Sequence, residues 1–131
     1  MAFDAFSAIV VSADPHELPR RAAILRRFDY DVTAFLEGDA AITHLTGFDR
    51  SEIPYSLLVT DMRAGLERGF AIADIFWEMT GCAPVIFVYD GPPGCFSVIP
   101  QANTAFLAHP FSSAAFIATI HRLLPEPADD A

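Results

Sequence analysis

The chain has 131 residues, of which 53% are hydrophobic and twelve are phenylalanine, and its formal net charge is −9. This length suits one domain with a single hydrophobic core, and the composition argues against global disorder. The acidic balance argues against a nucleic-acid-binding face and against docking on anionic membranes, because both need clustered basic residues.

The N-terminal residues, MAFDAF, have neither a basic start nor a long apolar stretch, so we expect no signal peptide. No segment approaches the roughly 18 apolar residues of a membrane span. We therefore expect a cytoplasmic protein. Its two cysteines, Cys82 and Cys95, flank a predicted strand at opposite ends and show no metal-binding spacing, which favours two reduced thiols.

Short runs of apolar or alternating residues predict five β-strands. They lie at residues 7–11, 31–35, 56–60, 84–89 and 105–108. The first, third and fourth runs are apolar almost throughout, which is typical of central strands in a parallel sheet.

A first helix is expected after Asp14, which is a favourable N-cap and is followed by a proline. Pro19 removes a hydrogen bond beyond the first turn, so this helix starts late or bends. Ala22, Leu25 and Phe28 form its inward stripe, with the arginines elsewhere.

Three further helices are expected, over residues 38–47, 69–81 and 112–124. Asp39 caps the first of them and a serine caps the last. The domain thus extends over residues 1–124, and residues 125–131 form a flexible acidic tail.

The segment 91–101, between the fourth and fifth strands, contains three prolines and two glycines. We expect no more than about two helical turns there, so a helix at this place is short or irregular. Its apolar side chains, Phe96, Val98 and Ile99, either pack on their own core or form a partner-binding surface.

Strands alternating with helices predict an α/β fold, a doubly wound five-stranded parallel sheet in the order 2-1-3-4-5. In such folds function gathers outside the carboxyl ends of the strands, near the switch point between strands 1 and 3.

Polar side chains follow several strands at that edge. Asp61 stands out, because a carboxylate at the end of a buried strand is costly to desolvate unless it is satisfied or used. Three other residues at this edge also have a purely structural interpretation: Asp14 as a helix cap, Asp90 as a turn residue and His109 as a loop residue. The complete set of residues expected at this edge is Ser12, Ala13, Asp14, Asp61, Tyr89, Asp90 and His109.

Three stretches, LLVTDMRAGLERG, APVIFVYD and AFLAHPFSSAAFIATIHRLL, resemble the receiver domain of bacterial two-component response regulators. The resemblance covers residues 6–124 and implies the flavodoxin-like receiver fold. Asp61 matches the phosphoacceptor at the end of strand 3, and Gly69 matches a glycine eight residues later. Phe106 matches an aromatic position on strand 5. The Lys-Pro-Phe after that strand is His109-Pro110-Phe111 here, which implies a cis bond before the proline.

The chain also departs from that family. The acidic pair that holds Mg²⁺ in receivers is Ser12 and Ala13 here, with Asp14 one residue later. The family's Thr or Ser after strand 4 is Tyr89, and its Lys after strand 5 is His109. Phosphoryl transfer depends on positioning and charge neutralisation, and Mg²⁺ prefers carboxylate oxygens. The sequence therefore predicts a disassembled phosphorylation site.

Three functions are compatible with these residues. The first is a degenerate receiver without enzymatic activity or cofactor, which acts by protein–protein interaction largely without phosphorylation. The second is a phosphorelay receiver phosphorylated on Asp61 with Mg²⁺, in which Asp14 or Asp90 replaces the lost acids. The third is a small ligand- or metal-binding flavodoxin-like domain. The expected partners are signalling proteins, a histidine kinase or a downstream target, rather than nucleic acid or membrane. The sequence leaves open whether the chain forms a homodimer.

We expect Asp61 to hold Mg²⁺ only weakly, with Asp14 and the backbone of Arg63 as the remaining ligands. Hydrogen bonds from Tyr89 or from protonated His109 would then satisfy the carboxylate. On this hypothesis Asp61→Asn is tolerated or even stabilising, because it relieves repulsion among clustered carboxylates.

Overall fold

A computed structural model describes residues 6–49, 52–63, 66–81, 83–90 and 103–124. Five strands of five residues each form one sheet in the order β2-β1-β3-β4-β5, and each neighbouring pair is parallel. This is the predicted doubly wound topology. The strands are β1 (Ser7–Val11), β2 (Asp31–Phe35), β3 (Leu57–Asp61), β4 (Val85–Tyr89) and β5 (Thr104–Ala108).

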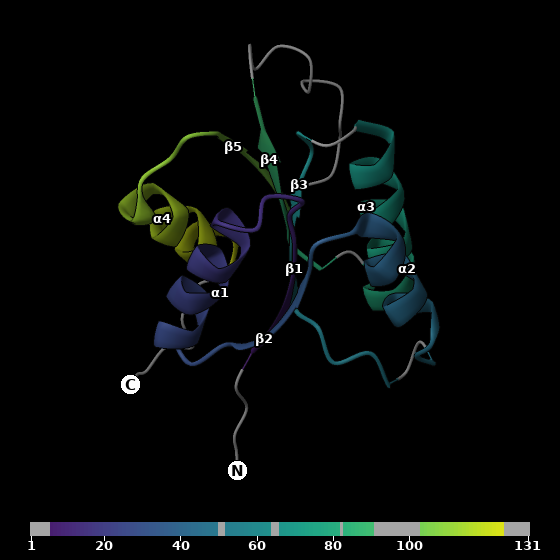
Figure 1. Cartoon of the computed structure of the whole chain (residues 1–131). Coiled ribbons are helices and arrows are strands. Elements are labelled where there is room, and N and C mark those ends of the chain that lie inside the picture. Colours follow the sequence, from purple (N-terminus) through teal and green to yellow (C-terminus); the bar gives the residue numbers. More distant parts are fainter. Residues whose placement is uncertain (1–5, 50–51, 64–65, 82, 91–102, 125–131) are drawn as a thin grey trace, which may run out of the picture.

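Helices cover both faces of the sheet (Figure 1). Those described are α1 (Glu17–Arg27), α2 (Gly38–Thr46), α3 (Leu66–Thr80) and α4 (Ser113–Leu123). α1 and α4 lie on one face, and α2 and α3 lie on the other. The result is a three-layer α/β structure with a separate apolar core on each side of the sheet.

Strand alternation divides the buried side chains between the two cores. Val59 and Val88 point toward α1 and α4. Leu58, Phe87 and Tyr89 point toward α2 and α3. All residues of β3 and β4 are buried. Because side chains alternate along a strand, the carboxylate at the end of β3 is directed to the same side as Val59, toward α1.

The N-terminal part of α1 agrees with the prediction and its buried face does not. The helix begins at Glu17, so Pro19 falls in the first turn, where no backbone partner is needed. Arg21, expected outside the inward stripe, is only 1% exposed. Phe28, expected inward, is 42% exposed, because it lies just past the end of the helix. Its ring packs edge to face against His121.

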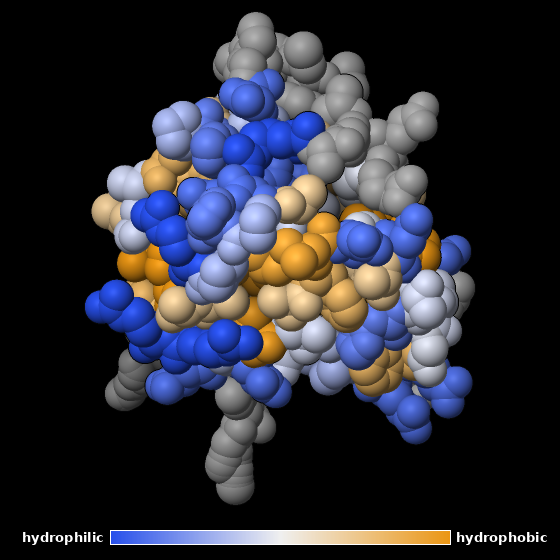
Figure 2. Space-filling model, viewed as in Figure 1, coloured by the Kyte–Doolittle hydropathy of each residue, from blue (hydrophilic) through white to orange (hydrophobic). Residues whose placement is uncertain are grey.

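Two large hydrophobic side chains are exposed in the described part of the chain, Phe28 and Leu36, the latter to 50%. Figure 2 shows hydrophobic residues reaching the surface among hydrophilic ones on the face drawn. Phe28 precedes β2 and Leu36 follows it, so about 17 Å of strand separates them. The two side chains therefore do not belong to one patch.

Several local predictions are settled by the structure. The N-cap of α2 is Glu37 in extended backbone, not Asp39, which lies within the first helical turn. α3 begins at Leu66, ahead of the predicted residue 69. Ser112 caps α4 as predicted, since its Oγ accepts from the backbone N–H of Ala115 at 3.0 Å.

The bond between His109 and Pro110 is cis, as the resemblance implied. Other predictions fall outside the described residues. These are the segment 91–101 with Phe96, Val98 and Ile99, the thiols of Cys82 and Cys95, and the tail 125–131. Among the helices that the structure describes, none is long and apolar enough to cross a membrane.

Gly69 lies within α3, against the end of β3. A Cβ at this position would collide with the Sδ of Met62, so the buried side chain of Met62 would have to shift. The close approach of α3 to the residue after Asp61 therefore depends on the missing side chain.

We predict that Gly69→Ala lowers the free energy of unfolding by about 1 kcal/mol. Overpacking costs about 1–3 kcal/mol, and the better helix propensity of alanine offsets up to about 1 kcal/mol of it. Urea denaturation measures the change. Gly47→Ala is the matched control, because a Cβ there comes no closer than 3.4 Å to the carbonyl of His44. Equal stability of the two variants would contradict the packing argument.

Candidate functional site

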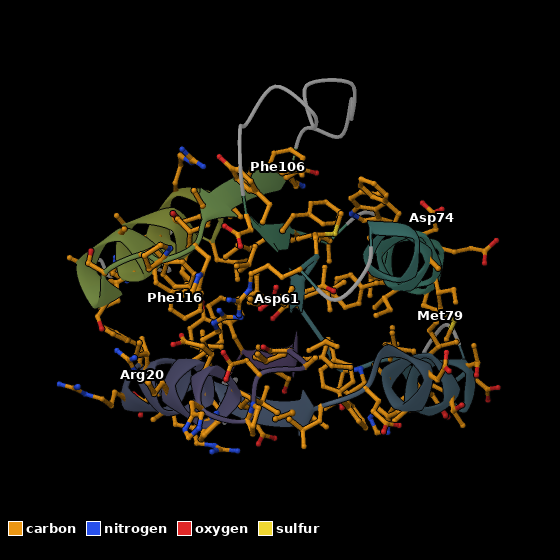
Figure 3. All side chains as sticks on the ribbon, turned by 45° about the horizontal axis from the view of Figure 1, so that its top comes forward. Arg20, Asp61, Asp74, Met79, Phe106 and Phe116 are labelled. Carbon is orange, nitrogen blue, oxygen red and sulfur yellow. The ribbon has the colours of Figure 1, made fainter. Side chains whose placement is uncertain are left out.

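Asp61 is the last residue of β3, at the carboxyl edge of the sheet beside the end of β1. Its side chain is 3% exposed. Figure 3 shows Asp61 near the middle of the molecule, between the layer of α1 and α4 and the layer of α2 and α3. The carboxylate therefore lies at the predicted switch point of the sheet, largely withdrawn from water.

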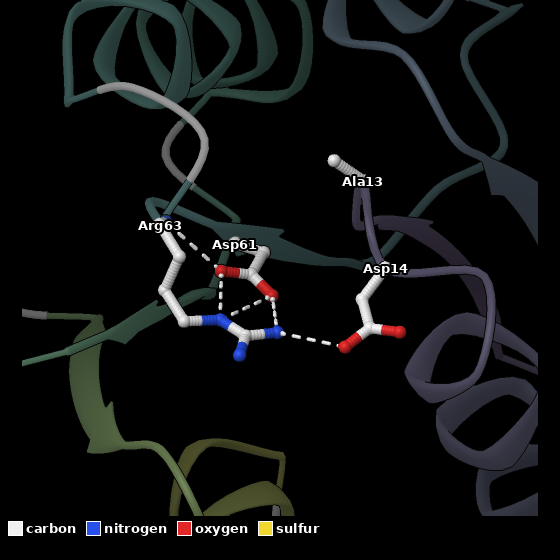
Figure 4. A pocket seen from close by; sticks show the side chains of 4 residues that line it. All are labelled: Ala13, Asp14, Asp61 and Arg63. Carbon is white, nitrogen blue, oxygen red and sulfur yellow. Dashed lines mark hydrogen bonds and ion pairs between the residues drawn. The ribbon is translucent and has the colours of Figure 1, made fainter.

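Arg63 holds this carboxylate from the outer side (Figure 4). Its backbone N–H and its Nε donate to Oδ1 of Asp61 at 3.0 and 2.9 Å, and its Nη2 donates to Oδ2 at 2.8 Å. This two-pronged contact between a guanidinium and a carboxylate is the strong, geometrically specific kind of ion pair.

Arg21 of α1 holds the same carboxylate from the inner side. Its Nη1 donates to Oδ2 of Asp61 at 3.0 Å, and its side chain is 1% exposed. The guanidinium lies over the ring of Phe111, 5.1 Å from the ring centre, which adds a cation–π contact. Glu17, one turn earlier in α1, lies 3.7 Å from Nη2. Arg21 thus connects α1 to the end of β3 through a buried ion pair.

Ser12 completes the set of donors, since its Oγ donates to Oδ2 of Asp61 at 3.1 Å. Burial by itself raises the pKa of the Asp61 carboxyl. The hydrogen bonds from Arg63 and Arg21, with the charge of Arg21, outweigh burial and lower this pKa from 3.8 to about 2. Asp61 is consequently ionised and fully satisfied at neutral pH.

A pocket of about 340 Å³ opens beside the carboxylate, lined by Ala13, Asp14, Asp61 and Arg63 (Figure 4). The N-cap residue of α1 is His16, not Asp14 as predicted, but Oδ1 of Asp14 accepts from the backbone N–H groups of His16 at 2.9 Å and Glu17 at 3.3 Å just ahead of the helix. The hydrogen bond from His16 holds the pKa of Asp14 below its usual value. Its Oδ2 lies 3.7 Å from Nη2 of Arg63. Of the residues predicted for this edge, Ser12, Ala13, Asp14 and Asp61 therefore lie together.

The other predicted residues lie elsewhere. Tyr89 is buried in the core on the α2 and α3 side, where its ring meets Phe106 edge to face. Asp90 is exposed, and His109 packs edge to face on Phe111. The expectation that Tyr89 or His109 would donate to Asp61 is wrong. Strand alternation turns Tyr89 to the opposite face, and two arginines and a serine supply the hydrogen bonds.

Sequence reasoning missed the side chains of Arg21 and Arg63. A signal for Arg21 was present, because it lies three residues after Leu18 and four before Leu25, both buried in α1. An arginine on a buried helical stripe needs an acidic partner. Arg63 gave no such signal, since a loop arginine two residues after a strand is usually solvated.

The receiver resemblance implies Mg²⁺ at this site, and the residues present do not fit it. Mg²⁺ requires an octahedral shell of oxygen ligands. Both oxygens of Asp61 accept hydrogen bonds from guanidinium groups, and Ser12 and Ala13 supply no carboxylate. Within the described ranges, no group of three or more His, Cys, Asp or Glu residues is arranged to hold a metal ion.

The parallel sheet in the order 2-1-3-4-5, with an aspartate at the end of β3, defines the class of fold: it is the receiver fold of response regulators. No protein-family model matches the chain, and no curated protein matches it. The similarity is carried by solved structures, and the predicted resemblance is confirmed at the level of the fold.

Three of these structures illustrate the similarity. A response regulator receiver protein from Sinorhizobium medicae WSM419 has a TM-score of 0.80 and 21% identity, over 95% of this chain and 98% of that chain. The receiver protein from Burkholderia phymatum has a TM-score of 0.75 and 19% identity, over 95% and 99%. The receiver domain of PhyR from Erythrobacter litoralis has a TM-score of 0.73 and 14% identity, over 97% and 95%.

We predict that Asp61→Asn destabilises the protein by about 3 kcal/mol, since removing one partner of a buried ion pair leaves the other charge uncompensated. The sequence-based expectation of a tolerated or stabilising change assumed neighbouring carboxylates. The structure surrounds Asp61 with guanidinium groups, so the expected sign is reversed. Chemical denaturation measures the loss. Asp74→Asn, at an exposed position of α3, is the control and should change stability little.

We also predict that the stability gap between the natural protein and Asp61→Asn narrows as the pH falls from about 4 to about 2. A carboxyl group whose pKa is lower in the folded state stabilises the fold above its unfolded pKa, here 3.8, and this contribution is lost as the pH falls through the folded pKa of about 2. The loss amounts to about 2 kcal/mol. Denaturant titrations of both proteins at stepped pH measure it, and a gap that stays constant over this range would contradict the prediction.

Proposed function

We propose that this chain is a receiver-fold signalling module that works through contacts with other proteins and without phosphorylation of Asp61. The similarity to response regulator receiver proteins supports the signalling role. Both carboxylate oxygens of Asp61 already accept hydrogen bonds, which supports a function that does not depend on phosphorylation. No enzymatic activity of its own is part of the proposal.

One observation carries the proposal: both oxygens of Asp61 are already engaged. Arg63 donates to Oδ1 twice, and Oδ2 accepts from Arg21, Arg63 and Ser12. An ionised carboxylate offers about four lone-pair sites. Attack on a phosphoryl group needs one of them free and aimed at phosphorus, with cations neutralising the incoming charge. A donor would have to displace Arg63 before it could react.

The partners proposed are signalling proteins, either a histidine kinase or a downstream target. The net charge of −9 supports protein partners over nucleic acid or an anionic membrane.

A second candidate is a phosphorelay receiver that is phosphorylated on Asp61. One observation favours it. Guanidinium groups are strong ligands for phosphate oxygens, and Arg63 lies beside the pocket with its side chain 21% exposed. In this alternative, Arg63 turns from the carboxylate to the phosphoryl group once that group has arrived.

Incubation with Mg²⁺ and a small acyl-phosphate donor, followed by intact-mass measurement, separates the two candidates. We predict no phosphoryl adduct on the natural protein under conditions that fully modify a phosphorylatable receiver treated in parallel. An adduct that is absent from Asp61→Asn would overturn the proposal and establish the second candidate. The amide spectrum of the variant, recorded first, shows that it is folded.

A further inference from the structure

The charges around Asp61 form a cluster of three carboxylates and two guanidinium groups. The carboxylates are Asp61 at the end of β3, Asp14 before α1, and Glu17 in its first turn. The guanidinium groups are Arg21 in α1 and Arg63 after β3. Each carboxylate lies within 4 Å of at least one guanidinium nitrogen.

Arg63 occupies the position between the two acidic side chains of the pocket. Its Nη2 lies 2.8 Å from Oδ2 of Asp61 and 3.7 Å from Oδ2 of Asp14 (Figure 4). A cation shared by two carboxylates across a loop is the arrangement that a divalent metal would otherwise provide. Here the bridging positive charge is covalently attached to the chain.

Arg21 makes the same place less suitable for a free cation. Its guanidinium is buried against Oδ2 of Asp61 at 3.0 Å and cannot leave for solvent as an exposed side chain could. A divalent ion at Oδ2 would meet this fixed positive charge, so a cation that replaces the Arg63 side chain has to bind at Oδ1 of Asp61 and Oδ2 of Asp14, which Arg21 does not contact. Repulsion in a site of low dielectric constant is stronger than in water.

We infer that Arg63 is a tethered cation that takes the place of a divalent metal at this site, and that its removal uncovers a cation-binding pocket formed by Asp61 and Asp14. The inference deepens the proposed function and rests on the same closed carboxylate. It makes a separate claim, since it concerns which cation neutralises the pocket and not whether Asp61 accepts a phosphoryl group.

The test uses Mn²⁺ alone, without a phosphoryl donor, and follows paramagnetic broadening of the amide signals of residues 12–14 and 61–63. Arg63→Met removes the tethered charge and keeps a side chain of similar reach. Because Arg63 is partly exposed, this variant should fold, and Arg63→Lys, which keeps the charge, gives a second comparison.

The expected result is that Arg63→Met binds Mn²⁺ at least about tenfold more tightly than the natural protein. Arg63→Lys should stay close to the natural protein, and the double variant Arg63→Met with Asp61→Asn should lose the gain. Arg20→Met is the matched control for net charge, because Arg20 is an exposed arginine of α1 that contacts only Glu17 among the acidic residues described.

Two results would overturn the inference. One is broadening around Asp61 in the natural protein at the same Mn²⁺ concentration as in Arg63→Met. The other is an equal gain in affinity from Arg20→Met, which would show that overall charge controls binding. A phosphoryl adduct in the mass experiment alone would overturn the proposed function, whereas unchanged Mn²⁺ affinity alone would overturn this inference.

Discussion

The buried ion pair between Arg21 and Asp61 is the interaction on which the arrangement of the site depends. Two charges withdrawn from water carry a large desolvation cost, which is recovered only with good geometry and further hydrogen bonds. Arg63 and Ser12 supply these at the carboxylate, whereas Phe111 covers the Arg21 guanidinium, whose buried Nε and Nη2 donate no hydrogen bond to any described residue. Because the partners come from the residue after β1, the loop after β3, α1 and the segment before α4, the pair connects these elements to one another.

The two apolar cores, one on each side of the sheet, explain which side chains can reach that pair. Alternate residues of each central strand face opposite helical layers, so Asp61 shares a side with Val59 and with α1. Tyr89 shares its side with Phe87 and with α3. A residue at the same edge of the sheet is therefore not necessarily a member of the same site. Two residues that end neighbouring strands can point to opposite faces of the sheet.

The comparison with solved receivers separates the fold from the chemistry. Structures that share about a fifth of their residues with this chain have the same strand order over nearly its full length. A fold of this kind hosts many functions, and the function is carried by the residues of the site. In this chain the aspartate at the end of β3 lies among arginines, and its chemistry follows from those neighbours.

The sequence by itself determined the elements and their order. Apolar or alternating strand runs of four to six residues, helices between them and the serine before α4 are local signals, and strand–helix alternation permits few topologies. The sequence also placed Asp61, Ser12, Ala13 and Asp14 at one edge, because the carboxyl ends of parallel strands meet there. These inferences needed only periodicity and the rules of chain connection.

Only the tertiary structure decided what surrounds Asp61. Arg21 precedes it by forty residues, and Arg63 gains its role from the turn that bends its side chain back to the carboxylate. Both contacts depend on distances between separate elements, and residue type alone allowed a metal, a hydroxyl group or an imidazole in the same place. The charged partner of a buried carboxylate is selected by geometry, because a few ångströms in a region of low dielectric constant decide whether an ion pair compensates for its desolvation.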